Sequence, residues 1–291
     1  WEVCNSYTRG GYSVKIAITG ASGFIGRHVL TSLLNYDVDI IAVTRDASKL
    51  ASLNNSVQIV KMDISHASPN CFEQMSKPDV LIHLAWDGLP NYKSLHHFET
   101  ELPKHYHFLK MMIEAGLPSL LVTGTCFEYG MQSGLLSSDL ITTPNNPYGY
   151  AKDALRKQLE FLKSDSKFNF TWARLFYMYG EGQSSASLYT KLKEAVARGD
   201  KVFNMSGGEQ LRDFLDVEEV AQQLVQLALT QRDMGCVNVS SGYPISVRKL
   251  VEQWLNKNDW NIDLNLGYYP YPDYEPMAFW GDNPTLDTLQ K

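Results

Sequence analysis

Short runs of apolar, often β-branched residues recur along the first part of the chain, and longer segments with apolar residues at helical spacing separate them. The runs predict buried strands and the longer segments predict helices. This alternation is typical of a parallel sheet covered by helices, so the sequence predicts an α/β fold with a doubly wound parallel sheet. The predicted strands are residues 14–19, 38–44, 57–61, 80–85, 120–125 and 170–175. The predicted helices run from the first strand to about residue 35, across 93–115 with a break at Pro103, and across 147–164.

The rhythm changes after residue 175, where the elements become shorter. We predict a first domain over residues 13–175, to which 214–240 return, and a smaller interleaved C-terminal domain over 176–213 and 241–291. Residues 1–12 are polar and irregular and are set apart as a disordered or artificial leader. The later predictions are helices at 188–198, 217–229 and 246–254, strands at 201–203 and 237–239, and an irregular stretch at 268–276.

Composition narrows the possible partners. The chain has 291 residues, 44% of them hydrophobic, and its 26 Lys and Arg against 32 Asp and Glu give a net charge of −6. A mildly acidic chain without basic runs argues against a nucleic-acid partner, and no apolar run approaches the ~20 residues of a membrane span. The scattered cysteines (Cys4, Cys71, Cys126 and Cys236) predict no metal site and no disulfide framework, and free thiols favour a cytoplasmic location.

A glycine-rich segment stands directly between the first strand and its helix. Gly20 permits a tight turn, Gly23 lets a phosphate approach the backbone, and Gly26 lets the helix pack closely on the strand. Free amides at the helix N-terminus suit a pyrophosphate, although an ordinary strand-to-helix turn is the alternative. The pattern favours a Rossmann-like dinucleotide site in the first domain, which leaves the second domain to hold the substrate. Its predicted ligands are Gly20, Ser22, Gly23, Phe24, Ile25 and Gly26.

The end of the second strand distinguishes the two nicotinamide cofactors, because NAD sites usually place an acid there and NADP sites an Arg. Thr44 stands at the position of the acid and Arg45 follows it. We therefore predict NADP(H), with Arg45 on the 2′-phosphate and Thr44 as its helper. A shift of one residue would put Asp46 at the ribose and favour NAD, and Arg45 would then be a solvated loop charge.

Other residues at the carboxyl ends of the strands are predicted to contact the cofactor. Asp63 can accept a hydrogen bond from the adenine amino group or simply form a turn. Ile64, Leu84 and Ala85 stand at the same sheet edge, where ligands of α/β proteins bind. His83 is assigned no chemistry, because a satisfied core histidine fits equally well.

The catalytic prediction rests on Tyr148 and Lys152, which are four residues apart in a predicted helix and so share one face. A nearby ammonium lowers the pKa of a phenol, which suits proton transfer near neutral pH. Thr125 ends a strand at the same sheet edge, where its hydroxyl can hydrogen-bond a carbonyl beside Tyr148. Tyr150 lies on a different helix face and cannot replace Tyr148.

Together these residues resemble the extended short-chain dehydrogenase/reductase family, the sugar-nucleotide epimerases, dehydratases and ketoreductases. The resemblance implies that Tyr148 is the acid/base, that Lys152 tunes it and binds the nicotinamide ribose, and that Thr125 is the catalytic hydroxyl. It covers about residues 15–286, nearly the whole chain. The matching segments are Thr19 to Gly26, His83-Leu84-Ala85, Tyr129-Gly130, the Tyr148 and Lys152 pair, and Arg212 to Val217.

The same resemblance implies a nucleotide-diphosphate sugar as substrate. Arg212 and Arg174 lie in regions that the family uses for the diphosphate, and Arg212 is the better candidate. Its alternative is a salt bridge with Asp213 or Glu209. Trp86 begins a loop that could shape the sugar pocket, so we predict that it contacts the substrate together with Thr125, Tyr148 and Arg212.

Two departures from the family pattern bear on the reaction. Cys126 and Phe127 stand where hexose 4,6-dehydratases of the family carry an Asp-Glu pair, which argues against removal of water. The usual Asn in the helix before the fifth strand is absent, and His105 or His107 stands in that stretch instead.

These features predict NADP(H)-dependent reduction of a nucleotide-linked 4-keto-6-deoxy sugar. The pattern is most similar to dTDP-4-dehydro-6-deoxyglucose reductases and CDP-abequose synthases. An NAD-dependent C4 epimerase and a non-catalytic dinucleotide-binding scaffold are the alternatives. Leu155, Leu159 and Leu162 form a helical stripe that should face the core. The family resemblance further implies a homodimer, paired through this helix and the one before the fifth strand.

Overall fold

Seven parallel strands form the main sheet, in the order β13-β9-β7-β6-β3-β4-β5. The computed structural model describes residues 8–9, 12–53, 55–283 and 289. Side chains in the central strands are buried on both faces, as parallel sheets require, and the predicted doubly wound class is confirmed. The strands are β3 (Lys15–Thr19), β4 (Asp39–Thr44), β5 (Gln58–Lys61), β6 (Val80–His83), β7 (Ser119–Thr125), β9 (Asn169–Leu175) and β13 (Gly235–Val239).

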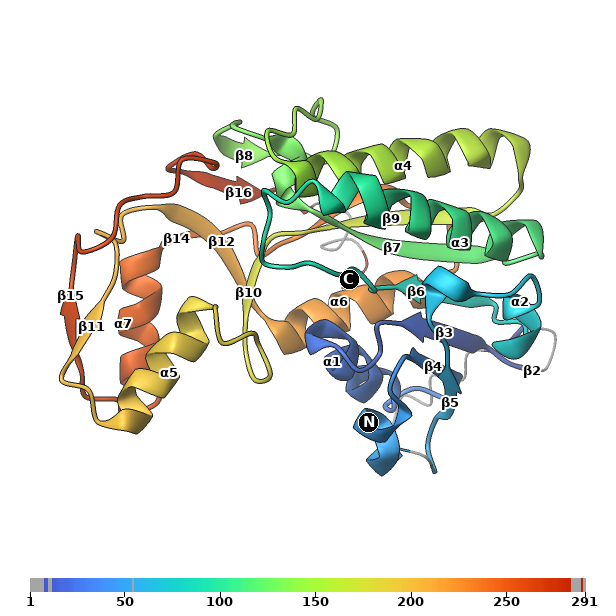
Figure 1. Cartoon of the computed structure of the whole chain (residues 1–291), viewed down its shortest axis with the longest axis horizontal. Coiled ribbons are helices and arrows are strands. Elements are labelled where there is room, and N and C mark those ends of the chain that lie inside the picture. Colours follow the sequence, from blue (N-terminus) through green and yellow to red (C-terminus); the bar gives the residue numbers. More distant parts are fainter. Residues whose placement is uncertain (1–7, 10–11, 54, 284–288, 290–291) are drawn as a thin grey trace.

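Helices cover both faces of this sheet (Figure 1). On one face, α1 (Phe24–Leu33) and α6 (Val217–Leu229) pack against each other and against the strands. On the other face lie α3 (Leu102–Glu114) and α4 (Pro147–Asp165), with the short α2 (Cys71–Gln74). Within the predicted stripe on α4, Leu155 and Leu159 are fully buried and Leu162 packs partly buried against the same cluster. The apolar stripe therefore faces the core, as its spacing predicts.

The predicted break at Pro103 has a definite form. A π-helical turn, η3 (His97–Glu101), leads into α3, and Pro103 occupies the first turn of that helix, where its missing N–H costs nothing. Three 3₁₀ turns follow strand ends elsewhere and escaped the pattern analysis: η1 (Ala47–Leu53), η2 (Ile64–His66) and η4 (Cys126–Tyr129).

A smaller lobe stands beside the carboxyl edge of the main sheet, at the left of Figure 1. Helices α5 (Leu188–Arg198) and α7 (Val247–Lys257) pack there around Leu192, Val251 and Trp254. Ser246 caps α7 by accepting a hydrogen bond from the Lys249 amide, as the sequence predicts. The short strands of this part are β10 (Tyr177–Tyr179), β11 (Val202–Asn204), β12 (Leu211–Asp216), β14 (Pro244–Ser246), β15 (Asp263–Asn265), and β16 (Phe279–Gly281) with β8 (Gly134–Leu136).

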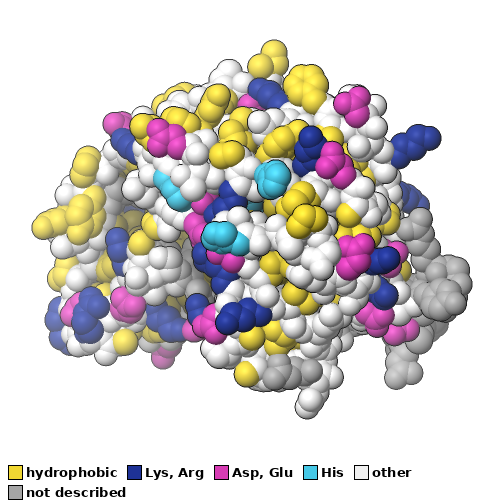
Figure 2. All heavy atoms as spheres, turned by 45° about the vertical axis from the view of Figure 1, so that its right-hand side comes forward, with side chains coloured by type: hydrophobic (Ala, Val, Ile, Leu, Met, Phe, Trp, Pro, Cys, Tyr) yellow, Lys and Arg dark blue, Asp and Glu magenta, His cyan; other side chains and the backbone are white. Residues whose placement is uncertain are grey.

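The region predicted as an irregular leader lies mostly outside the described residues. Within it, β1 (Thr8–Arg9) pairs antiparallel with β2 (Tyr12–Ser13). None of the helices in the described part of the chain is long and apolar enough to cross a bilayer. On the face shown in Figure 2, positive and negative side chains are interspersed around histidine side chains beside a hollow in the surface.

Candidate active site

A cavity of about 1080 Å³ opens along the carboxyl ends of the main strands and extends to the smaller lobe. Every residue predicted to bind cofactor or substrate lines it, except Lys152. Lys152 is 2% exposed, because its side chain is buried against Trp86 and the backbone of β7. The remaining predicted residues therefore face one continuous space.

The glycine loop has the geometry of a phosphate cradle. Gly20 has a φ of +71°, and a Cβ there would lie 2.9 Å from the amide nitrogen of Ala85. A Cβ at Gly26 would collide with the carbonyl oxygen of Gly20. Helix α1 begins at Phe24 after Gly23, and no side chain caps its first amides. The loop therefore fits a dinucleotide, because uncapped amides at a helix N-terminus bind pyrophosphate oxygens.

At the adenosine end, Thr44 and Asp46 are held in place by local hydrogen bonds. The Thr44 hydroxyl lies 2.9 Å from that of Ser22. The Asp46 carboxylate accepts hydrogen bonds from the amide and hydroxyl of Ser48, at 3.1 and 2.6 Å. These bonds lower the pKa of Asp46 and tie its carboxylate to the following turn. The geometry thus favours Arg45 over Asp46 as the group beside the ribose.

Arg45 already has a partner inside the cavity. Its guanidinium donates two parallel hydrogen bonds to the Asp87 carboxylate, at 2.9 and 3.0 Å. The Lys104 ammonium lies 3.6 Å from the same carboxylate. A 2′-phosphate would therefore share the Arg45 guanidinium with Asp87 or displace it, a competition that the sequence did not reveal.

Asp63 forms a turn, one of the two roles that the sequence allows for it. One of its oxygens accepts a hydrogen bond from the Ser65 amide at 2.9 Å and caps η2. This bond lowers the pKa of the carboxyl, so Asp63 is ionised. Asp63 and Ile64 both line the cavity, so the turn leaves the adenine contact possible.

Strand β7 and helix α4 bring Thr125 and Tyr148 together. Thr125 ends β7 and caps η4, and Tyr148 stands in the first turn of α4. The turn and the helix pack closely, because a Cβ at Gly149 would lie 2.5 Å from the carbonyl oxygen of Phe127. The Tyr148 and Thr125 side chains consequently line the same part of the cavity, close enough for Thr125 to influence the pKa of the phenol. Lys152 lies one turn further along α4 and donates to the Thr123 carbonyl at 2.9 Å.

The predicted lowering of the Tyr148 pKa by the Lys152 ammonium is not found in the free protein. Burial raises the pKa of Tyr148, with further rises from Tyr92, Glu128 and Cys126, and the Thr125 hydrogen bond opposes them only in part. Burial also lowers the pKa of Lys152 to about 7, so its charge is partial at neutral pH. The prediction of an acidified phenol was therefore wrong here, and Tyr148 carries its proton.

At the substrate end, Arg212 pairs with an acid that the sequence did not suggest. Its guanidinium lies 3.1 Å from the carboxylate of Glu275, to which the Tyr177 hydroxyl also donates. The expected alternatives were wrong: Asp213 accepts hydrogen bonds from Ser241 and Gly242 instead. Arg212 still lines the cavity, with its charge partly balanced by Glu275.

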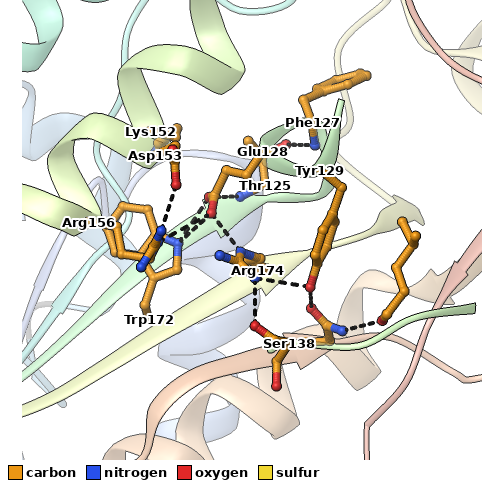
Figure 3. Close-up of polar contacts among 12 residues, drawn as sticks. Thr125, Phe127, Glu128, Tyr129, Ser138, Lys152, Asp153, Arg156, Trp172 and Arg174 are labelled. Atoms are coloured by element: carbon orange, nitrogen blue, oxygen red, sulfur yellow. Dashed lines mark hydrogen bonds and ion pairs between the residues drawn. The ribbon is translucent and has the colours of Figure 1, made fainter. Parts of the chain in front are cut away.

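Arg174 is not a substrate ligand but part of a buried network behind Thr125 (Figure 3). Its guanidinium donates to the Glu128 carboxylate at 2.6 Å and to the Tyr129 hydroxyl at 3.1 Å. Glu128 also accepts hydrogen bonds from the Thr125 amide and the Trp172 indole, at 2.9 and 3.0 Å. The Thr-x-x-Glu spacing of a capping box was a visible signal for Glu128 that the sequence analysis missed.

The comparisons agree with this geometry. The model of the NAD dependent epimerase/dehydratase family matches residues 16–239. The chain belongs to this family. It is therefore an enzyme of a family whose members act on sugar nucleotides with a nicotinamide cofactor.

Two curated relatives of this family member illustrate the range of reactions. The dTDP-6-deoxy-L-talose 4-dehydrogenase (NAD(+)) of Aggregatibacter actinomycetemcomitans is 31% identical over 270 residues, which is 92% of this chain and 99% of the relative. The CDP-abequose synthase of Salmonella typhimurium is 23% identical over 223 residues, covering 75% of this chain and 71% of the relative.

A solved structure of MoeE5 in complex with UDP-glucose and NAD superposes with a TM-score of 0.79 at 25% identity, covering 94% of this chain and 91% of MoeE5. A UDP-N-acetylglucosamine 4-epimerase from Methanobrevibacter ruminantium shares the fold, with a TM-score of 0.83 at 20% identity and coverage of 96% and 92%. The architecture of the main sheet is therefore that of the family.

Proposed function

We propose that this enzyme reduces the 4-keto group of a nucleotide-linked 6-deoxy sugar. The observation that carries the proposal is that a protonated Tyr148 and Thr125 line the same cavity as the glycine loop. A protonated phenol is the state that a reductase needs, because the carbonyl oxygen must receive a proton. The 4-dehydrogenase from Aggregatibacter, which matches almost end to end, supports a redox reaction at this sugar position.

In the proposed reaction, a bound reduced nicotinamide would supply the hydride that reaches the carbonyl carbon of the sugar and would leave as the oxidised cofactor. Tyr148 donates its hydroxyl proton to the carbonyl oxygen, and Thr125 donates a hydrogen bond to the same oxygen. The products are the alcohol and the Tyr148 phenolate, which regains a proton from solvent. Lys152, one turn further along α4, would hold the nicotinamide ribose.

A dehydratase finds less support. Cys126 and Phe127 follow Thr125, and burial raises the pKa of the Cys126 thiol far above neutral pH. Neither side chain can therefore act as a carboxylate acid or base in the removal of water. The nearby Glu275 carboxylate is bound by Arg212 and Tyr177.

A C4 epimerase is the second candidate, favoured by the family's shared fold and by the same three catalytic side chains. An epimerase returns the hydride to the sugar and leaves the cofactor unchanged over a cycle. The two reactions are separated by following the cofactor's absorbance at 340 nm while the sugar products are resolved by chromatography.

We propose NADP(H) as the cofactor, with a modest preference over NAD(H). Thr44 leaves no acid at the ribose, and Arg45 and Lys49 both line the adenosine end of the cavity. Asp87 opposes this preference, because its negative carboxylate already pairs with the Arg45 guanidinium that would bind the 2′-phosphate. The name of the Aggregatibacter relative specifies NAD(+), so both cofactors belong in every assay.

The proposal is tested with a panel of dTDP-, CDP-, GDP- and UDP-linked 4-keto-6-deoxy sugars, each with NADPH and with NADH. Stoichiometric oxidation of the cofactor and appearance of the 4-hydroxy sugar are expected for at least one member. Interconversion of 4-hydroxy epimers without net oxidation would favour the epimerase. No turnover with any member would overturn both candidates.

A further inference from the structure

A buried chain of hydrogen bonds runs beneath the cavity from β3 to α3. The Thr19 hydroxyl lies 2.8 Å from Nδ1 of His83, and Nε2 of His83 lies 2.7 Å from Nδ1 of His105. Nε2 of His105 lies 3.0 Å from the Glu101 carboxylate. Because a carboxylate only accepts, His105 donates to Glu101, His83 donates to His105, and Thr19 donates to His83. These hydrogen bonds thus fix the neutral rings of His83 and His105 in one orientation.

His105 and His107 both stand in the stretch where the family's usual Asn is absent, and of the two His105 is buried whereas His107 is exposed. His105 contacts Lys152 only through a third residue. The Trp86 indole stacks on the His105 ring with centroids 4.6 Å apart and planes at 12°. The Lys152 ammonium lies 4.1 Å from the centroid of the Trp86 ring. Trp86 therefore links the fixed histidine to the lysine.

The indole is held at its edge as well. Its N–H donates to Nδ1 of His97 at 3.1 Å, and Nε2 of His97 donates to the Asn91 carbonyl at 2.8 Å. Trp86 can only donate and a carbonyl only accepts, so the bonds set the His97 tautomer. A ring held on its face and at its edge is a rigid support.

Lys152 needs such a support because little else compensates its buried charge. Its ammonium donates to the Thr123 carbonyl, and burial lowers its pKa to about 7. The carboxylates of Glu128 and Glu101 favour the charged form from a distance, and the neighbouring His83 and His105 are neutral. A cation over an indole ring in a buried site gains stabilisation that water does not screen.

We propose that Trp86 is a positioning residue for the cofactor: its ring, stacked on His105, holds the Lys152 ammonium under the cavity in the charged state that binds the nicotinamide ribose. This role rests on the proposed function of Lys152 and adds to it a residue with no direct part in proton transfer. It is a second role for Trp86, beside the predicted contact with the substrate, since Trp86 also lines the cavity.

The experiment compares Trp86→Phe, which keeps an aromatic face, with Trp86→Leu, which keeps apolar bulk without one. The equilibrium Kd of NADPH and of NADH is measured from pH 5.5 to 9 by calorimetry. In Trp86→Leu the Kd should rise about tenfold, as expected for a desolvated cation–π contact, and Trp86→Phe should stay within about threefold of wild type.

The pH dependence separates positioning from a general loss of structure. Without the indole face Lys152 loses its proton more readily, so the decline of cofactor affinity with rising pH should begin about one pH unit lower in Trp86→Leu than in wild type. Trp86→Phe should restore the wild-type profile. A uniform loss of affinity at every pH would overturn the proposal, and so would tighter binding in Trp86→Leu, which would make Trp86 a shield over Lys152.

Lys152→Ala distinguishes a failure of this inference from a failure of the proposed function. If Lys152→Ala leaves cofactor affinity unchanged, the function of Lys152 is wrong and the inference falls with it. If Lys152→Ala weakens binding and Trp86→Leu does not, only the role of Trp86 is wrong. Adding Trp86→Leu to Lys152→Ala should cause no further loss, because the two changes remove the same interaction.

Discussion

The substitution Tyr148→Phe removes one hydroxyl from the centre of the site and leaves the aromatic ring. That ring packs against His97, Tyr92 and Trp86, with centroids 5.2, 5.6 and 6.1 Å away, and these contacts persist in the variant. Only the hydroxyl and its interaction with Thr125 are lost, and even a full hydrogen bond there would contribute only about 1 kcal/mol to the fold. The Tm should therefore change little.

Turnover should change far more than stability. Loss of a general acid lowers kcat by roughly 10²–10⁴-fold, which corresponds to about 3–5 kcal/mol of transition-state stabilisation. The assay is the reduction of the best panel substrate at saturating cofactor, with the cofactor Kd measured in parallel and expected to stay near the wild-type value.

Tyr150→Phe is the matched control. It makes the same change two residues away on α4, where the Tyr150 ring is 53% exposed and contacts Phe98. Its kcat should equal that of wild type. Near-normal turnover of Tyr148→Phe, or equal losses in both variants, would refute the assignment of Tyr148 as the proton donor.

Three further outcomes follow from the same structure. Arg45→Ala should raise the Kd of NADPH about tenfold and leave that of NADH nearly unchanged, whereas Asp87→Asn should tighten NADPH; equal effects on both cofactors would remove Arg45 from the 2′-phosphate. Burial lowers the pKa of His105 to about 4 in the folded protein, from an ordinary value of about 6.5. Between these two pH values the His105 ring binds a proton in the unfolded chain but not in the folded protein, so acid favours unfolding. The Tm should fall as pH drops through this window in thermal melts followed by circular dichroism, and a constant Tm would contradict the neutral His105. Light scattering should give the mass of a homodimer, consistent with the 75% exposed Phe161 on α4, and a monomer at micromolar concentration would exclude the expected pairing.

The local features of the site were predictable because they depend on short spacings. Tyr148 and Lys152 are one helical turn apart, and Thr125 ends a strand whose β-branched run is easy to recognise. The glycine loop lies directly between a strand and a helix. Parallel topology then brings these separate segments to one edge of the sheet, so their convergence follows from the fold class.

The partners that tune these residues were not predictable in the same way. Glu275 lies in an irregular segment without periodicity, so nothing in the sequence connected it with Arg212. The π-helical turn before Pro103 shifts the helix phase, which left His105 and His107 undistinguished. Asp87 follows β6 and reaches Arg45 after β4 across the intervening strand β3. The short strands of the smaller lobe contain too few residues to show alternation.

The most direct test of the central claim follows the hydride itself. NADPH carrying deuterium at C4 of the nicotinamide is incubated with the best 4-keto-6-deoxy sugar nucleotide, and the purified product is examined by NMR. The account predicts that the deuterium appears at C4 of the sugar in a single configuration, with one oxidised cofactor per product. A product without deuterium at C4, or 4-hydroxy epimers formed while the cofactor stays reduced, would contradict it.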